Sequence, residues 1–375
     1  MTCLGLMEWT SRWLRLWQKN GQGNWRAEIL QNQAELFPLT VCYAAQDAGW
    51  RRLLGLGWLM GTSPWQVGWP AWKTLGRRPA GALSDFLPDW RPDKLWRIGS
   101  RKITSQRLLQ LILAPLHSTL RHCPLWGMLL PSYWDEAQFA DFTRELHRAG
   151  LISGVPVAQD LALACAAWQQ HGPWNLALVV DLDDHALVVT QASCREPDVF
   201  VQRRLVVPEL GRRIWIARLI NLCAELSIRL CRQDPRLSRQ AFQHLAFELT
   251  TVLPRLHQEH FHFQLHVSDF HAEFSLTPEL VKQACLQLAQ ASAKLIKDLL
   301  APHTEVFLSR RLADLPDMIR VVYQTLEHRR PIYVVDETPY LEAAGQLASS
   351  AEACAASASS LWRYARVLPD WVKAT

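Results

Sequence analysis

The sequence lacks paired cysteines, long apolar runs and the usual signature of a serine hydrolase. Its nine cysteines are scattered singly, without a C-x-x-C pair, which is typical of reduced thiols in the cytoplasm. No apolar run approaches the ~20 residues that a membrane span requires, and residues 1–6 carry no export signal. No G-x-S-x-G motif is present, which argues against Ser-His-Asp hydrolysis. We therefore expect a soluble, cytoplasmic chain, whose 375 residues suffice for two lobes with separate cores.

Charge and tryptophan are distributed unevenly along the chain. Residues 1–110 contain 15 Lys and Arg against 7 Asp and Glu, whereas the remainder contains 25 against 28. Eleven of the 18 tryptophans also lie before residue 97. This composition suits contact with a membrane surface or a nucleic acid. We prefer a lobe that uses its tryptophans as core, with peripheral membrane contact as the alternative and nucleic acid as a disfavoured partner.

The stretch from Trp174 to Gln191 predicts the centre of the fold. Leu176–Val180 is apolar at every position, as in a strand covered on both faces. An acidic turn follows, and then a second run rich in valine, so the pattern indicates two strands joined by a tight turn. The turn contains Asp181, Asp183 and Asp184. These carboxylates either form a solvated turn or face a magnesium–nucleotide.

The rest of the chain predicts alternating helices and strands. Near the N-terminus, residues 13–30 fit a hairpin that turns at Asn20-Gly21, with an interfacial amphipathic helix over residues 9–19 as the alternative. We expect residues 62–92 to be mostly loop, because glycine and proline interrupt them. Helices are expected at residues 105–120, 135–149, 161–170, 212–231, 238–257, 277–300, 316–327 and 342–358. Further strands are expected at residues 39–44, 125–130, 155–157, 199–207, 261–267, 273–276, 306–308 and 333–335.

The densest histidine cluster lies at residues 257–271. Strand alternation places His262, Gln264 and His266 on one face. Two histidines four residues apart on a strand are too far apart to share a metal ion. We therefore interpret the cluster as the polar face of an antiparallel hairpin.

The order of these elements resembles the nucleotide-binding domain of the DnaK-type heat-shock chaperones. Residues 130–138 resemble that family's "VPAYFNDAQRQA", residues 160–168 its "EPTAAALAYG", and the hairpin after Trp174 its "VFDLGGGTFDVSI". Leu210-Gly211 resembles "LGG", and residues 342–348 resemble "EAVAxGAA". The resemblance implies a two-lobed, actin-like (ribonuclease H-like) α/β fold. One lobe would comprise residues 1–173 with 346–375, and the other residues 174–345.

The same resemblance locates a nucleotide cleft whose key residues are replaced. Met7 stands for the family's aspartate, Trp9 for a glycine, Leu87 for the catalytic lysine and Gln159 for the glutamate that positions water. Asp183-Asp184 replaces the loop glycines, and Arg310-Arg311 replaces the glycines on the adenosine side. The positions that match the cleft are Gly5, Thr10, Ser11, Gln159, Asp181, Asp183, Gly211, Arg310, Arg311 and Gly345.

These replacements predict a protein without ATP hydrolysis. Phosphoryl transfer depends on positioning and on charge stabilisation, and the residues that supply both are missing. We therefore expect a chaperone-like pseudo-ATPase without catalytic residues, metal or cofactor, which binds another protein. The alternative is a weak ATPase that binds ATP or ADP with Mg²⁺ on Asp181, Asp183 and Asp184. We expect the chain to lack the family's peptide-binding domain.

Overall fold

The protein is described by a computed structural model that places most of the chain. The described residues are 4–31, 34–43, 64–75, 81–123, 125–151, 154–195, 198–267, 270–327, 330–353 and 364–366. The fold is mixed α/β and divides into two compact units. The first comprises Met1–Leu130 with Trp134–Pro156, and the second Pro131–Tyr133 with Val157–Thr375. No helix among the described residues is long and apolar enough to cross a membrane.

A mixed sheet forms the centre of the first unit, in the order β11-β10-β1-β2-β3, with β4 also paired to β2. Its strands are β1 (Leu4–Trp9), β2 (Trp13–Lys19), β3 (Trp25–Ala27), β4 (Phe37–Pro38), β10 (Leu125–Leu130) and β11 (Gly154–Ala158). β2 and β3 form the predicted hairpin, which places Lys19 opposite Trp25. The Asn20 side chain accepts hydrogen bonds from the amides of Gln22 and Asn24 and so fixes the turn. The helical alternative for this segment is therefore wrong.

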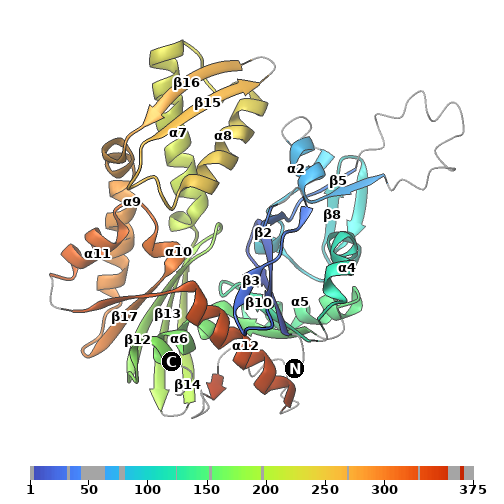
Figure 1. Cartoon of the computed structure of the whole chain (residues 1–375), viewed down its shortest axis with the longest axis vertical. Helices are drawn as coiled ribbons and strands as arrows, with labels where there is room; N and C mark the ends of the chain where they lie inside the picture. Colours follow the sequence, from blue (N-terminus) through green and yellow to red (C-terminus); the bar gives the residue numbers. More distant parts are fainter. Residues whose placement is uncertain are drawn as a thin grey trace, which may run out of the picture. The chain divides into compact units, whose positions relative to one another are not determined.

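Smaller elements surround this sheet (Figure 1). They are β5 (Val41–Tyr43), β6 (Trp65–Val67), α2 (Trp69–Leu75), β7 (Ala82–Leu83), η4 (Leu87–Asp89), β8 (Leu95–Ile98), β9 (Arg101–Thr104), α3 (Ser105–Leu113), η5 (Ala114–Leu116), α4 (His117–Leu120) and α5 (Glu136–Arg148). The loop prediction for residues 62–92 was wrong for α2, because Pro70 suits the first turn of a helix. The helix predicted at residues 105–120 breaks at Pro115, which lacks an amide hydrogen.

Tryptophan fills the core of the first unit. Trp9, Trp90 and Trp134 pack their rings against Phe142, with ring centroids 5.3, 5.0 and 4.7 Å away. The indole nitrogen of Trp134 donates to the carbonyl oxygen of Leu87, which lies in η4. These rings are almost completely buried. The tryptophans of the first third therefore serve in part as core, as predicted.

The second unit is built on a six-stranded mixed sheet in the order β18-β17-β12-β13-β14-β19. Its strands are β12 (Leu176–Leu182), β13 (Leu187–Arg195), β14 (Asp198–Val207), β17 (Thr304–Ser309), β18 (Ile332–Val335) and β19 (Tyr364–Arg366). β12, β17 and β18 run parallel, whereas β13 and β14 continue the sheet antiparallel. The hairpin predicted from the apolar runs is therefore confirmed, with Asp181 opposite Val188.

Helices and a second hairpin complete this unit (Figure 1). They are α6 (Gln159–His171), η6 (Pro208–Leu210), α7 (Arg212–Cys231), α8 (Arg239–Val252), β15 (Phe261–Val267), β16 (Phe270–Leu276), α9 (Pro278–Asp298), α10 (Arg310–Ala313), α11 (Met318–Thr325) and α12 (Glu337–Ala353). The helix predicted at residues 238–257 ends at Val252, because Pro254 cannot continue it. α6 and α12 pack together through buried alanines such as Ala164 and Ala344.

The boundaries of the compact units differ from those of the expected lobes. Residues 157–173, which include α6, group with the second unit rather than with the first. α12 groups with the second unit as well, and its packing on α6 accounts for the difference. The last residues of the expected small-residue helix, 354–358, lie outside the described part of the chain.

Candidate functional site

The acidic turn of the β12–β13 hairpin is bound to the first turn of α7. The Asp183 amide donates to the carbonyl oxygen of Ala186, and Asp183 Oδ1 accepts from the amide of His185 at 2.8 Å. The amides of Arg212 and Arg213 donate to the carbonyl oxygens of Asp183 and Asp184, both at 3.0 Å. Free amides at a helix N-terminus are a common anion-binding site. Here the hairpin's own carbonyl groups occupy these two.

Gly211 permits this close approach of the turn to the helix. It precedes α7 in extended backbone, so positive φ is not its role. A Cβ atom at this position would collide with the carbonyl oxygen of His185 and the amide nitrogen of Ala186. The glycine that resembles the family's "LGG" therefore serves here to join two parts of the chain.

Two of the three turn carboxylates form ion pairs with arginines. Arg311 Nη2 lies 2.8 Å from Asp181 Oδ2. Arg212 donates to both oxygens of Asp184, from Nε at 2.8 Å and from Nη2 at 3.1 Å. All three turn carboxylates are buried. Ion pairing offsets the cost of burying charged groups, and the two pairs also reduce the mutual repulsion of the carboxylates.

One carboxylate oxygen of the acidic turn accepts no hydrogen bond from the described residues. The buried Oδ1 atom of Asp181 has no hydrogen-bond partner among the described residues. The ring of Tyr340 lies beside the same ion pair, with its centroid 6.0 Å from Cζ of Arg311. An unsatisfied buried carboxylate oxygen is costly and marks a position to which a donor can be added.

The second unit brings together only part of the predicted cleft. One connected group contains four of the predicted positions, namely Asp181, Asp183, Gly211 and Arg311, together with Asp184 and His185. Arg310, although adjacent to Arg311, is directed to Asp314 and Asp336. Two further positions belong to other elements. Gln159 is buried at the first position of α6, and Gly345 is buried within α12, where its carbonyl oxygen accepts from Ser349.

The three N-terminal positions of the predicted cleft belong to the first unit. An added Cβ on Gly5 would lie 2.6 Å from the ring of Trp126, so Gly5 makes room for a core tryptophan. The Thr10 hydroxyl exchanges hydrogen bonds with the backbone of Trp13 and closes the β1–β2 turn. Ser11 is buried in the same turn. The positions therefore have local structural contacts of their own.

Sequence reasoning missed a buried ion pair around Asp160. Arg204 donates to both oxygens of this carboxylate, at 2.5 and 2.9 Å, and the Thr190 hydroxyl donates at 2.8 Å. The Asp160 amide donates to Ser132 Oγ, and Asp160 itself is fully buried in the first turn of α6. An aspartate that starts an otherwise alanine-rich, apolar helix was the available signal.

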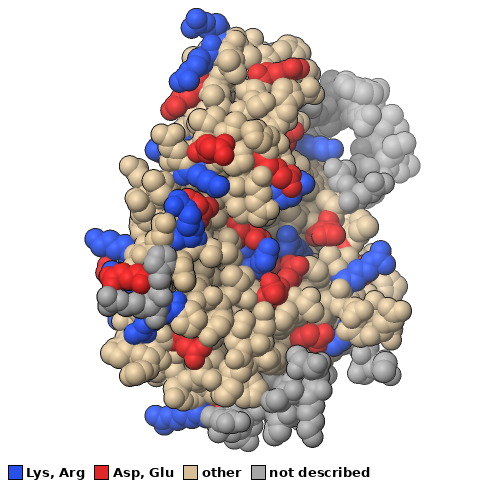
Figure 2. Space-filling model, turned by 60° about the vertical axis from the view of Figure 1, so that its left-hand side comes forward, with Lys and Arg blue, Asp and Glu red and all other residues tan. Residues whose placement is uncertain are grey.

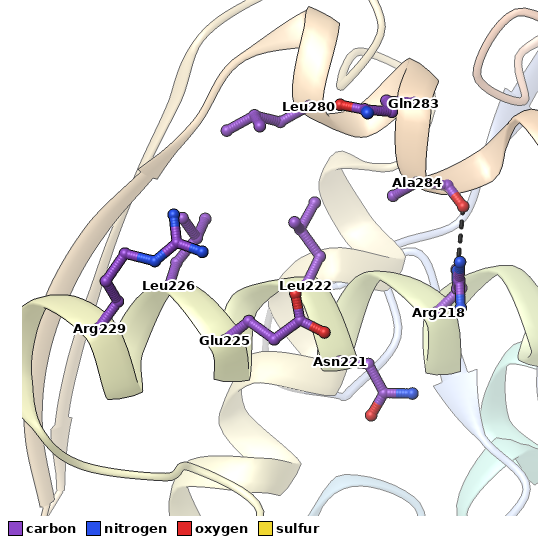
Figure 3. Close-up of a pocket in the computed structure, with 9 residues that line it drawn as sticks. All are labelled: Arg218, Asn221, Leu222, Glu225, Leu226, Arg229, Leu280, Gln283 and Ala284. Carbon is purple, nitrogen blue, oxygen red and sulfur yellow. Dashed lines mark hydrogen bonds between the residues drawn. The ribbon is translucent and has the colours of Figure 1, made fainter.

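A groove lies between α7 and α9 (Figure 3). Its volume is about 320 Å³. Leu222 and Leu226 point from α7 toward α9, and Leu280 extends from α9 along the groove. Arg218 crosses one end, where its Nε donates to the carbonyl oxygen of Ala284 at 3.0 Å. The remaining lining residues are Asn221, Glu225, Arg229 and Gln283.

The histidine cluster forms the exposed face of the β15–β16 hairpin, as predicted. His262 and His266 lie on either side of Glu273, with Nε2 to carboxylate distances of 3.8 and 3.3 Å. The other face packs Phe263 and Phe274 into the core. Within the described ranges, no group of three His, Cys, Asp or Glu residues is arranged to hold a metal ion.

Comparison with known proteins adds no relative to this description. No protein-family model matches the chain, and no curated protein gives a significant match. The fold and the site define a mixed α/β protein whose acidic hairpin turn is ion-paired and bound to a helix N-terminus.

Proposed function

We propose that the chain is a two-lobed, actin-like domain of the chaperone type that has lost ATP hydrolysis. In this proposal it acts in the cytoplasm as a scaffold that binds another protein during assembly or regulation. One observation carries the proposal: the chain's own groups occupy the site that corresponds to the phosphate loop. Carbonyl oxygens of the turn bind the amides of α7, and Arg311 binds Asp181.

These contacts oppose a magnesium–nucleotide for two physical reasons. A phosphate would have to displace the turn from the α7 amides, which Gly211 holds in close contact. A magnesium ion requires a near-octahedral set of oxygen ligands. To use Asp181 and Asp184 it would have to compete with the arginines that already form ion pairs with them. Catalysis of phosphoryl transfer depends on holding both the phosphate and the metal ion in defined positions.

The groove between α7 and α9 supports the binding part of the proposal. Leucine side chains line its floor, while Arg218, Glu225 and Arg229 lie at its rim. Interfaces combine an apolar centre with a polar rim in this way, and amphipathic helices use such grooves. We therefore place the contact with a partner helix in this groove.

Calorimetric titration of the purified chain with ATP and with ADP, each with Mg²⁺, tests the loss of nucleotide binding. The proposal expects no heat and no thermal stabilisation at millimolar nucleotide. Micromolar binding would contradict it. If binding is found, the titration is repeated with Asp181→Asn. Loss of the binding heat in that variant would show that the nucleotide binds at this turn.

Partner capture tests the scaffold role. Leu226→Glu places a charge on the groove floor and is expected to remove the captured partner. Leu230→Glu is the matched control, because Leu230 is exposed outside the groove lining. Equal capture of the partner by both variants would show that the partner does not bind in the groove.

A second candidate function is an ATPase with a remodelled phosphate site. The observation that favours it is Oδ1 of Asp181, which is buried and has no hydrogen-bond partner among the described residues. A hydrated cation could donate to this oxygen without breaking the Arg311 ion pair. The same titrations distinguish the two candidates.

A further inference from the structure

The two-stranded ribbon β8–β9 has one buried and one exposed face. Trp96, Ile98 and Ile103 are buried beneath it. Leu95 pairs with Thr104 and Arg97 with Lys102 across the exposed face. Leu95 is 60% exposed and places an apolar side chain among the charged residues of this face.

The exposed face belongs to the most basic segment of the first unit. Residues 91–107 contain six Lys and Arg but only one acidic residue, Asp93. Lys94 lies 3.9 Å from a carboxylate, that of Asp89. The other five cations form no ion pair with the described residues; four of them donate instead to neutral groups, namely Arg91 to Trp90, Arg97 to Gly99, Arg101 to Tyr43 and Arg107 to Gln110. On the face drawn in Figure 2, by contrast, Lys and Arg mostly lie beside Asp and Glu.

Arg97 and Lys102 stand directly opposite each other on this ribbon. Like charges in that arrangement repel and destabilise a strand pair. Arg101 stands opposite Ile98, next to the turn, and its guanidinium contacts Tyr43. Because an anionic surface would remove this repulsion, the arrangement favours an external anionic ligand.

We propose that the exposed face of β8–β9 docks on a membrane that contains anionic lipids. Lipid head groups supply a diffuse layer of negative charge, and the interface accepts an apolar side chain such as Leu95. Single-stranded nucleic acid is favoured by exposed aromatic rings on which bases stack. The aromatic residue of this ribbon, Trp96, is only 5% exposed and faces the core. This surface is separate from the groove of the proposed scaffold function.

Sedimentation with vesicles tests the proposal. Vesicles with about 30% phosphatidylserine are expected to bind the chain, and vesicles of phosphatidylcholine alone are not. Raising the salt concentration weakens the binding, because it screens the charges. Arg97→Glu removes two units of positive charge and is expected to lower vesicle affinity by at least tenfold.

The Arg97→Glu variant also separates binding from folding. The introduced carboxylate faces Lys102, so it forms an opposite-charge pair and the ribbon is expected to become no less stable. The matched control is Arg203→Glu, an exposed strand position in the second unit, which should retain vesicle binding. Unchanged binding by Arg97→Glu, or equal binding to both kinds of vesicle, would overturn the proposal. Tighter binding to an RNA oligonucleotide than to the anionic vesicles would also overturn it.

Discussion

Arg311 and Asp181 are joined by an ion pair of 2.8 Å between strand β12 and helix α10, 130 residues apart in the sequence. Asp181 is buried, whereas the Arg311 side chain retains 23% of its exposure. The pair places a cation of the chain itself beside the carboxylate that the family resemblance assigns to magnesium. It therefore contributes to the stability of this unit.

Arg311→Ala is expected to destabilise the protein, because it leaves a buried carboxylate without its cation. We expect the free energy of unfolding to fall by about 2–3 kcal/mol, somewhat less than for a fully buried pair. Urea denaturation measures the change. Arg310→Ala is the matched control and should cost less than about 1 kcal/mol, since its ion pairs are exposed. Equal losses of unfolding free energy for the two substitutions would show that the Asp181 pair adds no more stability than an exposed ion pair.

Gly211→Ala tests the contact between the acidic turn and α7. The added methyl group overlaps backbone atoms of His185 and Ala186, which cannot rotate away as a side chain can. We expect the free energy of unfolding, measured by urea denaturation, to fall by more than about 2 kcal/mol. Gly21→Ala is the control, because no atom lies within 4 Å of a Cβ at that position. A stability like that of the control would mean that the turn can move off the helix.

Local patterns predicted the elements but not the contacts that close the site. The apolar run before Asp181 and the valines after it specified the central hairpin, since strand alternation and burial act over a few residues. The resemblance drew attention to Arg310 and Arg311 together, yet they have different partners. Which of two adjacent arginines reaches Asp181 depends on how α10 begins after β17, and this follows from packing rather than from spacing.

Helix ends were predicted less well than helix centres. Pro254 ended α8 and Pro115 divided α3 from α4, because each removes an amide hydrogen from the helix. The ion pair of Asp160 with Arg204 joins a helix to a strand 44 residues further on. Such a partner carries no local signal in the sequence, so the pair became apparent only in the folded chain.

Two histidines of the second unit are expected to affect stability with opposite dependence on pH. The hydrogen bond to Glu248, 2.8 Å long, raises the pKa of His244 above its usual 6.5. Its contribution is complete below that usual value and is lost as pH rises through the raised pKa. Burial lowers the pKa of His257 instead, so stability is lost as pH falls below the usual value.

Urea midpoints between about pH 5 and pH 8 separate these two effects. His244→Gln should lower the midpoint at the acidic end and leave it unchanged at the alkaline end. His257→Gln should improve stability at the acidic end relative to the alkaline end. Both changes are expected to stay below about 1 kcal/mol, because His244 and Glu248 are substantially exposed. Parallel profiles for the two variants would contradict the assigned directions.

The buried pair of Asp160 and Arg204 should be worth more to the fold than the Arg311 pair, because both partners are almost inaccessible. Arg204→Met leaves the carboxylate with Thr190 and backbone donors only, and we expect a loss of about 3–5 kcal/mol. Asp160→Asn alone leaves the buried guanidinium without an anion, and we expect a similar loss of unfolding free energy. The double variant removes both charges and should recover at least half of the summed loss, which a double-mutant cycle in urea measures. Additive losses would mean that the two side chains stabilise the second unit independently, through packing rather than through their ion pair.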